Sequence, residues 1–237
     1  MKIIIASTST VYGGKYLAYL KPALTQLYNG IDEIVFIPYA RPSGLSHDAY
    51  TEVVAKFFAT INIKVKGIHE FDNPKSAINN AQAVFTGGGN TFLLVSKMYE
   101  NDLWEVLRQR INNEMPYLGT SAGSNITGQS MHNTNDMPII EVPSYKTLGV
   151  FPFNINPHYL DPAPDLLKHM GETRETRIKE YLHFNDVPVV ALREGSWIEG
   201  KGKQFFLRGN ETARVYFSLN NIREIRSGTD LCTLFNS

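Results

Sequence analysis

The run GTSAGSN at residues 119–125 has the pattern of a nucleophile elbow, a sharp turn that exposes a reactive serine between a strand and a helix. An apolar segment at 115–118 precedes the run, and a short helical stretch follows it. The flanking glycines allow a sharp turn and leave the hydroxyl of Ser121 open to a substrate. The same residues are also typical of a turn in which serine only caps a helix. The elbow therefore predicts hydrolase chemistry if a base and an oxyanion site lie nearby.

Three glycines and an asparagine at residues 87–90 follow another predicted strand. Backbone N–H groups in such a run can point at an anion without steric hindrance. The run lacks the Lys and Ser/Thr of a P-loop and the spacing of a dinucleotide fingerprint, which favours an oxyanion hole over a phosphate site. We expect the N–H of Gly88 or Gly89 to act together with that of Ala122, with Asn90 as a candidate substrate contact. A plain tight turn is the alternative.

A general base must accompany the serine, and the sequence holds six histidines. His158 stands out in the run NINPHY, because Pro157 fixes the backbone beside it and polar residues surround it. An ordinary loop histidine is the alternative interpretation. Asp136 and Glu194 are both candidates for the acid that orients the imidazole, and position alone favours neither. No grouping of histidine and acidic residues has the spacing of a helical metal site, so we predict neither a metal nor another cofactor.

The elements that must position these residues alternate along the chain. Short β-branched runs recur at 2–6, 33–39, 63–69, 83–86 and 115–118, and helical periodicity fills most of the gaps between them. This alternation predicts an α/β fold with a mostly parallel, doubly wound sheet and the site at the carboxyl ends of its strands. Beyond residue 187, glycine-bearing turns separate strands without helices, which predicts antiparallel hairpins near the C-terminus. We interpret residues 1–237 as a single domain.

The composition narrows the classes of partner. The 237 residues carry 23 basic and 23 acidic side chains, a formal net charge of zero, so we expect no nucleic-acid partner and no attraction to membrane surfaces. The apolar runs are too short to cross a bilayer, and the N-terminal residues lack a secretory signal, which favours a cytoplasmic location. The lone Cys232 excludes a disulfide within the chain. The sequence makes no prediction of oligomeric state.

Several ordered motifs resemble those of the peptidase E family, the α-aspartyl dipeptidases, which are serine peptidases that remove an N-terminal aspartate from dipeptides. The resemblance spans most of the chain, in the family's order, through FIPYA, GGGNTF, GTSAGSN, TNDMPI, INPH, GETRETRIKE and REGSWI. It implies Ser121 as nucleophile, His158 as base, and a sheet related to glutamine amidotransferase-like domains, in which cysteine replaces the serine. Thr120 departs from the pattern, because many members have tryptophan there. This difference bears on the shape of the pocket.

The resemblance makes Asp136 the first choice for the acid of a catalytic triad and Glu194 a close second. The other acid would then bind the substrate's ammonium group. Arg174 is the candidate for holding the substrate's aspartate side chain, because an arginine fork holds a carboxylate in a fixed plane. Its alternative role is in a solvated, mixed-charge helix face.

The prediction is therefore a dipeptidase that acts on small Asp-Xaa peptides through an acyl-enzyme. The alternatives are a cyanophycinase-like hydrolase of β-aspartyl linkages, an esterase, and a non-catalytic protein that binds acidic ligands. The polar loop at 128–147 is a candidate lid.

Overall fold

Seven strands form the larger of two sheets in this computed structural model, which describes residues 1–42, 44–161 and 172–235. In spatial order they are β3 (Lys64–Gly67), β2 (Glu33–Ile37), β4 (Val84–Thr86), β5 (Tyr117–Thr120), β1 (Lys2–Ala6), β8 (Ser196–Lys201) and β9 (Gln204–Gly209). The first five run parallel, and β8 and β9 add antiparallel strands at one edge. The predicted mostly parallel α/β sheet is confirmed.

Helices cover both faces of this sheet. Alternate strand residues point to opposite sides, so each strand packs against helices on both faces. On one face Ile4 and Phe36 pack in the same core as α1 (Lys21–Leu27) and α2 (His47–Ala59). On the other face Ile3 and Val35 pack with the remaining helices of this layer. These are α3 (Pro74–Asn80), α4 (Thr91–Glu100), α5 (Trp104–Asn112) and α6 (Ala122–Asn125), and the short 3₁₀ turns are η1 (Ala18–Leu20) and η2 (Ile68–Glu70). The near-continuous apolar runs of the strands follow from burial on both sides.

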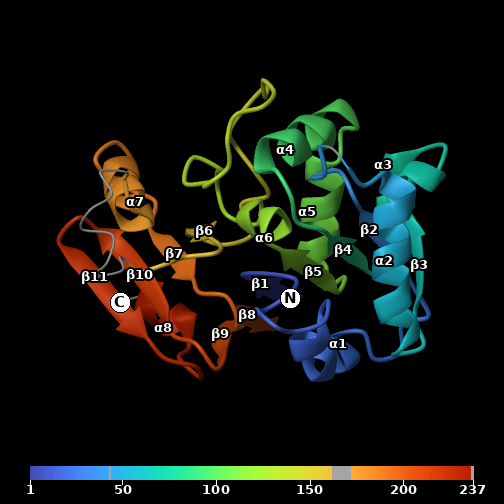
Figure 1. Cartoon of the computed structure of the whole chain (residues 1–237), viewed down its shortest axis with the longest axis horizontal. Helices are drawn as coiled ribbons and strands as arrows, with labels where there is room; N and C mark the ends of the chain where they lie inside the picture. The colour runs from blue at the N-terminus through green and yellow to red at the C-terminus, as the bar shows by residue number, and fades with distance from the viewer. Residues whose placement is uncertain (43, 162–171, 236–237) are drawn as a thin grey trace.

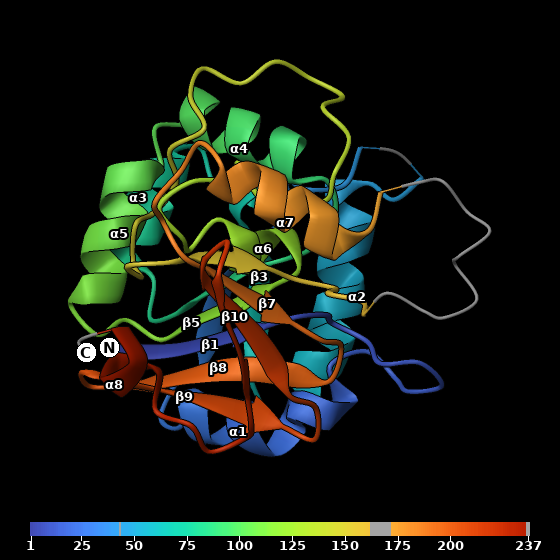
Figure 2. The same ribbon diagram turned by 90° about the vertical axis from the view of Figure 1, so that its left-hand side faces the viewer.

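A second sheet of four strands lies at one end of the molecule (Figure 1, left). Its order is β11 (Asn221–Ile225), β10 (Ala213–Ser218), β7 (Val189–Leu192) and β6 (Asn154–Asn156). The helix α7 (Arg174–Leu182) packs through Ile178 and Tyr181 on β7 and β10, and α8 (Leu231–Phe235) ends the described chain. Figure 2 shows this sheet in the foreground with α7 above it. The predicted antiparallel hairpins are present as β8–β9 and β10–β11.

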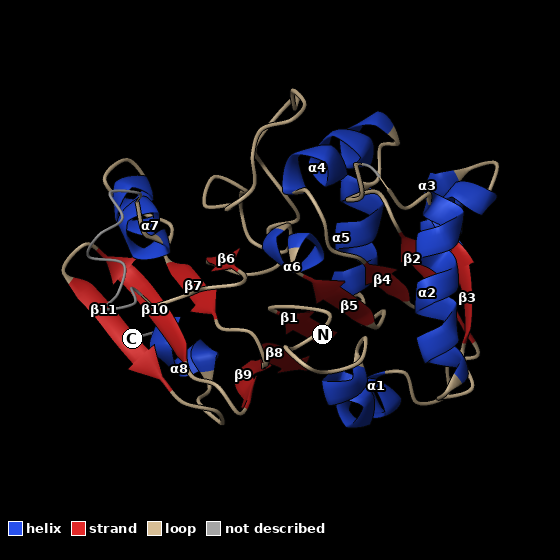
Figure 3. Ribbon diagram, viewed as in Figure 1, coloured by secondary structure: helices blue, strands red, loops and turns tan. Residues whose placement is uncertain are grey.

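The strand register brings chemistry-bearing residues together at one edge. Strands β1 and β5 pair with Ala6 opposite Thr120, so the residues that follow, Ser7 and Ser121, emerge side by side. The N–H of Ser121 donates to the carbonyl of Ala6 at 3.2 Å. A long connection without helix or strand, residues 126–153, links α6 to β6 above this edge (Figure 3). Within the described parts of the chain, none of the helices combines the length and apolar composition needed to cross a membrane.

Candidate active site

Ser121 lies on a strained turn between β5 and α6. Its φ of 54° and ψ of −113° fall in a region that residues with a side chain rarely adopt. A Cβ at Gly123 would lie 2.1 Å from the carbonyl oxygen of Thr86, so only glycine permits this close approach of the two segments. The strand–turn–helix context that the sequence predicted for an elbow is therefore present.

His158 joins Ser121 to an acid. Its Nε2 lies 2.8 Å from Ser121 Oγ, and its Nδ1 lies 2.6 Å from Glu194 Oε1. Both distances are those of hydrogen bonds, and the second is as short as a charge-assisted one. The three side chains thus form a continuous Ser–His–Glu chain with the base between nucleophile and acid, which is the arrangement of a catalytic triad.

The backbone of His158 is fixed by Ser7, the first residue after β1. The N–H of His158 donates to Ser7 Oγ at 2.8 Å, and that hydroxyl donates in turn to the carbonyl of Leu192 at 2.9 Å. His158 has a φ of 55°, so these contacts hold a conformation that the chain alone disfavours. The sequence predicted a site at the carboxyl ends of the parallel strands but assigned no role to Ser7. The available signal was a polar residue directly after a buried strand.

Glu194 reaches His158 because β6 and β7 run parallel and end together. The N–H of Tyr159 donates to the carbonyl of Leu192 at the end of β7. This bond places the residues that follow the two strands beside each other. Glu194 follows two residues later, with 43% of its side chain exposed against 31% for His158. The acid–base pair therefore faces the solvent-accessible side of the sheet edge.

Asp136, the first choice for the orienting acid, does not contact His158. Its Oδ2 accepts from the N–H of Thr91 at 2.7 Å and from Thr91 Oγ1 at 2.6 Å. The carboxylate thus satisfies the first turn of α4, where a negative charge is favourable. In this structure Glu194, and not Asp136, lies beside the imidazole, and the catalytic roles of the two acids stay predictions.

The predicted oxyanion donors divide into engaged and free amides. The N–H of Gly88 donates to the hydroxyl of Tyr50 at 3.1 Å, so this amide is already occupied. The N–H groups of Gly89 and Ala122 have no partner within the described residues. Asn90 is engaged at both ends of its amide, since its oxygen caps α4 at Leu93 and its Nδ2 donates to the carbonyl of Met137. These contacts anchor the loop, and contact between Asn90 and substrate stays a prediction.

Arg174 begins α7 and points its guanidinium toward the site, where Nη1 lies 3.5 Å from the carbonyl of Pro157, the residue before His158. Burial lowers the pKa of Arg174, and the neighbouring carboxylates of Asp136 and Glu194 oppose that shift. No carboxylate in the described ranges forms an ion pair with it. Arg174 is thus a half-buried cation that forms no ion pair with the described part of the chain, and it lies next to Pro157, the residue before His158.

The rest of the mixed-charge run behaves as an ordinary helix face. Arg177 and Lys179 pair with Glu172 and Glu175, respectively, at the surface. Glu175 also accepts from Arg214 of β10 at 3.2 Å, which ties the start of α7 to the second sheet. Gly171, which opens the run, and His169 lie outside the described residues.

Asparagines hold the long loop 126–153 against β6. Asn125 Nδ2 donates to the carbonyl of Ile155 at 2.7 Å, and Asn156 Nδ2 donates to that of Asn133 at 2.7 Å. Asn135 Nδ2 donates to the carbonyl of Pro157 at 3.0 Å. These contacts fasten the loop next to His158, and sequence reasoning did not identify them. Thr120, the departure from the family pattern, is fully buried below the elbow.

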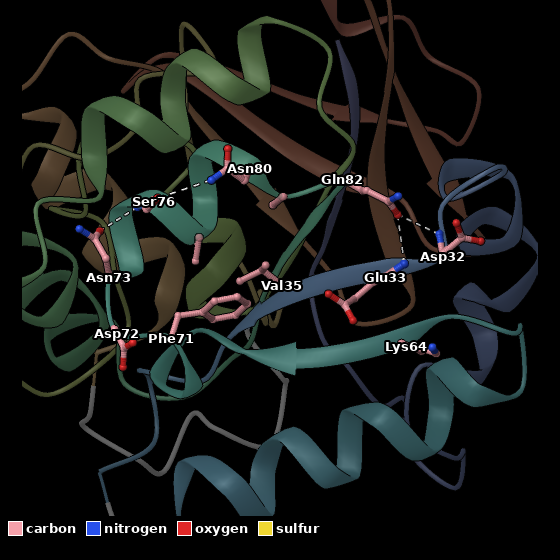
Figure 4. Close-up of a pocket in the computed structure, with 12 residues that line it drawn as sticks. Asp32, Glu33, Val35, Lys64, Phe71, Asp72, Asn73, Ser76, Asn80 and Gln82 are labelled. Atoms are coloured by element: carbon pink, nitrogen blue, oxygen red, sulfur yellow. Dashed lines mark hydrogen bonds between the residues drawn. The ribbon is translucent and has the colours of Figure 1, made fainter.

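A groove of about 530 Å³ lies elsewhere, between α3 and the outer strands β2 and β3 (Figure 4). Its polar groups serve the fold: Gln82 Oε1 accepts from the N–H groups of Asp32 and Glu33, and Asn73 caps α3 (Figure 4). None of the predicted site residues lines it. The triad edge therefore remains the site with convergent reactive groups.

Comparison with known proteins identifies the family. Residues 3–208 match the model of peptidase family S51. A protein named peptidase E from Streptomyces coelicolor is 43% identical over 236 residues, which cover 100% of this chain and 96% of that protein. A "probable alpha-aspartyl dipeptidase" from Drosophila melanogaster is 36% identical, with 98% and 96% covered. A peptidase E from Shewanella amazonensis is 41% identical, with 99% of each chain covered.

Solved structures share the fold. A putative peptidase E protein from Listeria monocytogenes superposes with a TM-score of 0.67 at 16% identity, covering 89% of this chain and 98% of the other. A peptidase from an acI-B1 actinobacterium gives 0.69 at 15% identity, with 97% and 95% covered. The family match over most of the sequence and the full-length relatives establish the class of protein. The chain belongs to peptidase family S51 and is a peptidase, a hydrolase.

Proposed function

We propose that this peptidase hydrolyses dipeptides with an N-terminal aspartate through an acyl-enzyme on Ser121. The observation that carries the proposal is the Ser121–His158–Glu194 chain of contacts beside the half-buried guanidinium of Arg174, for which residues 1–42, 44–161 and 172–235 supply no ion-pair partner. The name of the Drosophila melanogaster relative, a probable alpha-aspartyl dipeptidase, supports the choice of substrate.

In the first half of the reaction His158 Nε2 takes the proton of Ser121 Oγ as the oxygen attacks the peptide carbonyl. The N–H groups of Gly89 and Ala122 would donate hydrogen bonds to the negatively charged carbonyl oxygen and stabilise it. His158 then gives its proton to the leaving amine, and the second residue departs. Water, activated by the same imidazole, attacks the ester and releases aspartate. Glu194 holds the imidazole in position and stabilises the imidazolium that forms in each half.

The charges around the triad fit both ends of an N-terminal aspartate. Arg174 would hold the side-chain carboxylate, with the planar fork that carboxylates favour. Asp136 uses Oδ2 for the start of α4, whereas Oδ1 has no partner within the described residues. That oxygen is the group we assign to the substrate ammonium. Arg174 and Asp136 would thus each hold the group of opposite charge on the N-terminal aspartate, the side-chain carboxylate and the ammonium, respectively.

The experiment is the release of free amino acid from Asp-Leu, Asn-Leu, β-Asp-Leu and Leu-Leu by wild type and Arg174→Ala. We expect cleavage of Asp-Leu alone, and a loss in kcat/KM for Asp-Leu of about 10- to 100-fold in the variant, the value of one hydrogen-bonded charge. Arg177→Ala is the matched control, because Arg177 is on the same helix but 54% exposed and paired with Glu172. Equal losses in the two variants would remove Arg174 from substrate recognition.

The same panel, extended with simple esters and a serine-reactive phosphonate, separates the alternatives. Preference for β-Asp-Leu would support the cyanophycinase-like hydrolase, and cleavage of simple esters alone would support an esterase. No turnover, together with no labelling of Ser121 by a serine-reactive phosphonate, would support a non-catalytic binding protein. We retain as part of the proposal the cytoplasmic location and the absence of a nucleic-acid partner expected from the composition.

A further inference from the structure

The turn at residues 87–91 uses nearly all of its amides for the fold. Gly87 donates to the carbonyl of Ile37 at 3.1 Å, and Asn90 donates to that of Ala40 at 2.7 Å. Thr91 donates to Asp136, as described above. An amide without a protein partner at a reactive edge is free to donate to a ligand. Within the described residues, that amide in this turn is Gly89.

Tyr50 of α2 holds Gly88, the residue before Gly89, in place. Its hydroxyl accepts from the N–H of Gly88 at 3.1 Å and lies 3.3 Å from the carbonyl oxygen of Gly88, to which it donates. One side chain therefore holds both backbone polar groups of a residue that has no side chain of its own. This fixes the peptide planes on either side of Gly88, one of which carries the N–H of Gly89.

The Tyr50 ring is itself immobilised. It is 1% exposed and packs edge-on against Phe36, with centroids 4.9 Å apart and planes at 90°. The guanidinium of Arg41 lies 4.9 Å from the ring centroid on the outer side. A Cβ at Gly87 would lie 2.6 Å from the Tyr50 hydroxyl oxygen, so the hydroxyl sits directly against the turn.

The same turn touches the nucleophile. A Cβ at Gly88 would lie 2.8 Å from Ser121 Cβ and 3.4 Å from Ser121 Oγ. A shift of the turn therefore changes the distance between the free amide and the reacting carbonyl. A misplacement of about 1 Å in such a group can cost about 100-fold in rate.

We infer that Tyr50 is a positioning residue of the oxyanion site: its hydroxyl ties down Gly88 and so presents the N–H of Gly89 to the carbonyl under attack by Ser121. This inference rests on the function proposed above. It also assigns the oxyanion donor in the turn to Gly89 rather than Gly88. In the competing arrangement the N–H of Gly88 is the oxyanion donor, and the Tyr50 hydroxyl accepts from it only in the absence of substrate. Removal of the hydroxyl would then raise kcat instead of lowering it.

The test compares Tyr50→Phe with Tyr28→Phe in hydrolysis of Asp-Leu. Tyr28 belongs to the same buried core, is 2% exposed, and its hydroxyl also donates to a backbone carbonyl, that of Val84 at 3.4 Å. Both variants lose one buried hydroxyl, so both should lower the midpoint of thermal unfolding. We expect Tyr50→Phe alone to lower kcat by about 10- to 100-fold, part of the loss caused by removing an oxyanion donor outright, with KM within threefold of wild type.

A kcat for Tyr50→Phe within twofold of that of Tyr28→Phe, or above wild type, would overturn the inference. If Tyr50→Phe does not fold, 2,3-difluorotyrosine incorporated at position 50 alters the acidity of the hydroxyl with little change in size. A kcat changed by at least threefold with KM retained then supports the inference, and an unchanged kcat overturns it. Turnover of Asp-Leu by wild type and by Tyr28→Phe keeps these outcomes distinct from a failure of the proposed function, in which neither protein would act.

Discussion

Glu194→Gln tests the acid that the geometry places beside His158. The substitution keeps the size of the side chain and removes its negative charge, 2.6 Å from Nδ1 of the imidazole. In the proposed mechanism the imidazole takes up the proton of Ser121 during the attack and carries a positive charge from that point. The carboxylate therefore stabilises the transition state more than the ground state, and its loss should appear in kcat.

The magnitude follows from that distance and from exposure. Unit charges 2.6 Å apart interact by about 6 kcal/mol at an effective dielectric constant of 20 and by about 2 kcal/mol at 80. The side chains are 31% and 43% exposed, so the pair lies between these limits. A value of about 4 kcal/mol corresponds to a loss of about 1000-fold in kcat.

Asp136→Asn is the matched control, because it also removes one charge without changing size. Its carboxylate accepts hydrogen bonds at the start of α4, so we expect lower thermal stability. We also expect a higher KM, because the contact with the substrate ammonium is lost. The kcat should stay within about tenfold of the wild-type value, a far smaller change than the loss of a triad acid causes. The assay is steady-state hydrolysis of Asp-Leu at saturating substrate, with folding checked by circular dichroism. A larger loss of kcat in Asp136→Asn than in Glu194→Gln would refute the assignment.

Three further variants test the framework of the site. Gly88→Ala places a methyl group 2.8 Å from Ser121 Cβ, so steady-state kinetics should show kcat reduced about 100-fold. Arg214→Met removes the ion pair that ties Glu175 of α7 to the second sheet. It should raise KM for Asp-Leu several-fold while kcat is retained, and an unchanged KM would argue against that tie. An arginine hydrogen bond lowers the pKa of Asp161, so its contribution to stability is present above the unfolded pKa of about 3.9 and is lost as the pH falls through the lower folded value. Asp161→Asn should therefore flatten the acid-side decline in the free energy of unfolding, as measured by urea titration between about pH 5 and 2.

The parts of the fold that local patterns determine were predictable. Strand runs such as 2–6 and 83–86 are apolar on both faces, and that composition suits the centre of a parallel sheet. The elbow at Ser121 was recognisable because glycines, a preceding strand and a following helix are all local features. The convergence of the strand ends then followed from the topology of parallel sheets.

The choice between the acids depended on contacts that the sequence does not encode locally. Asp136 lies in the long loop 126–153, whose path is set by asparagine contacts to β6 and to Pro157 and by the N-terminus of α4. Glu194 meets His158 only because β6 and β7 pair in a second sheet, and that pairing was not predicted. Tyr50 was equally invisible, since in the sequence it belongs to the apolar face of α2.

The most direct test of the central claim is hydrolysis of Asp-Leu by wild type and Ser121→Ala, with intact-mass measurement after treatment with a serine-reactive phosphonate. We predict aspartate release by wild type only, a loss of about 10⁶-fold in kcat for the variant, and a single adduct that maps to Ser121. A variant that retains more than about a hundredth of the wild-type kcat, far above what loss of a triad serine leaves, or that still takes up the phosphonate, would contradict covalent catalysis by this residue.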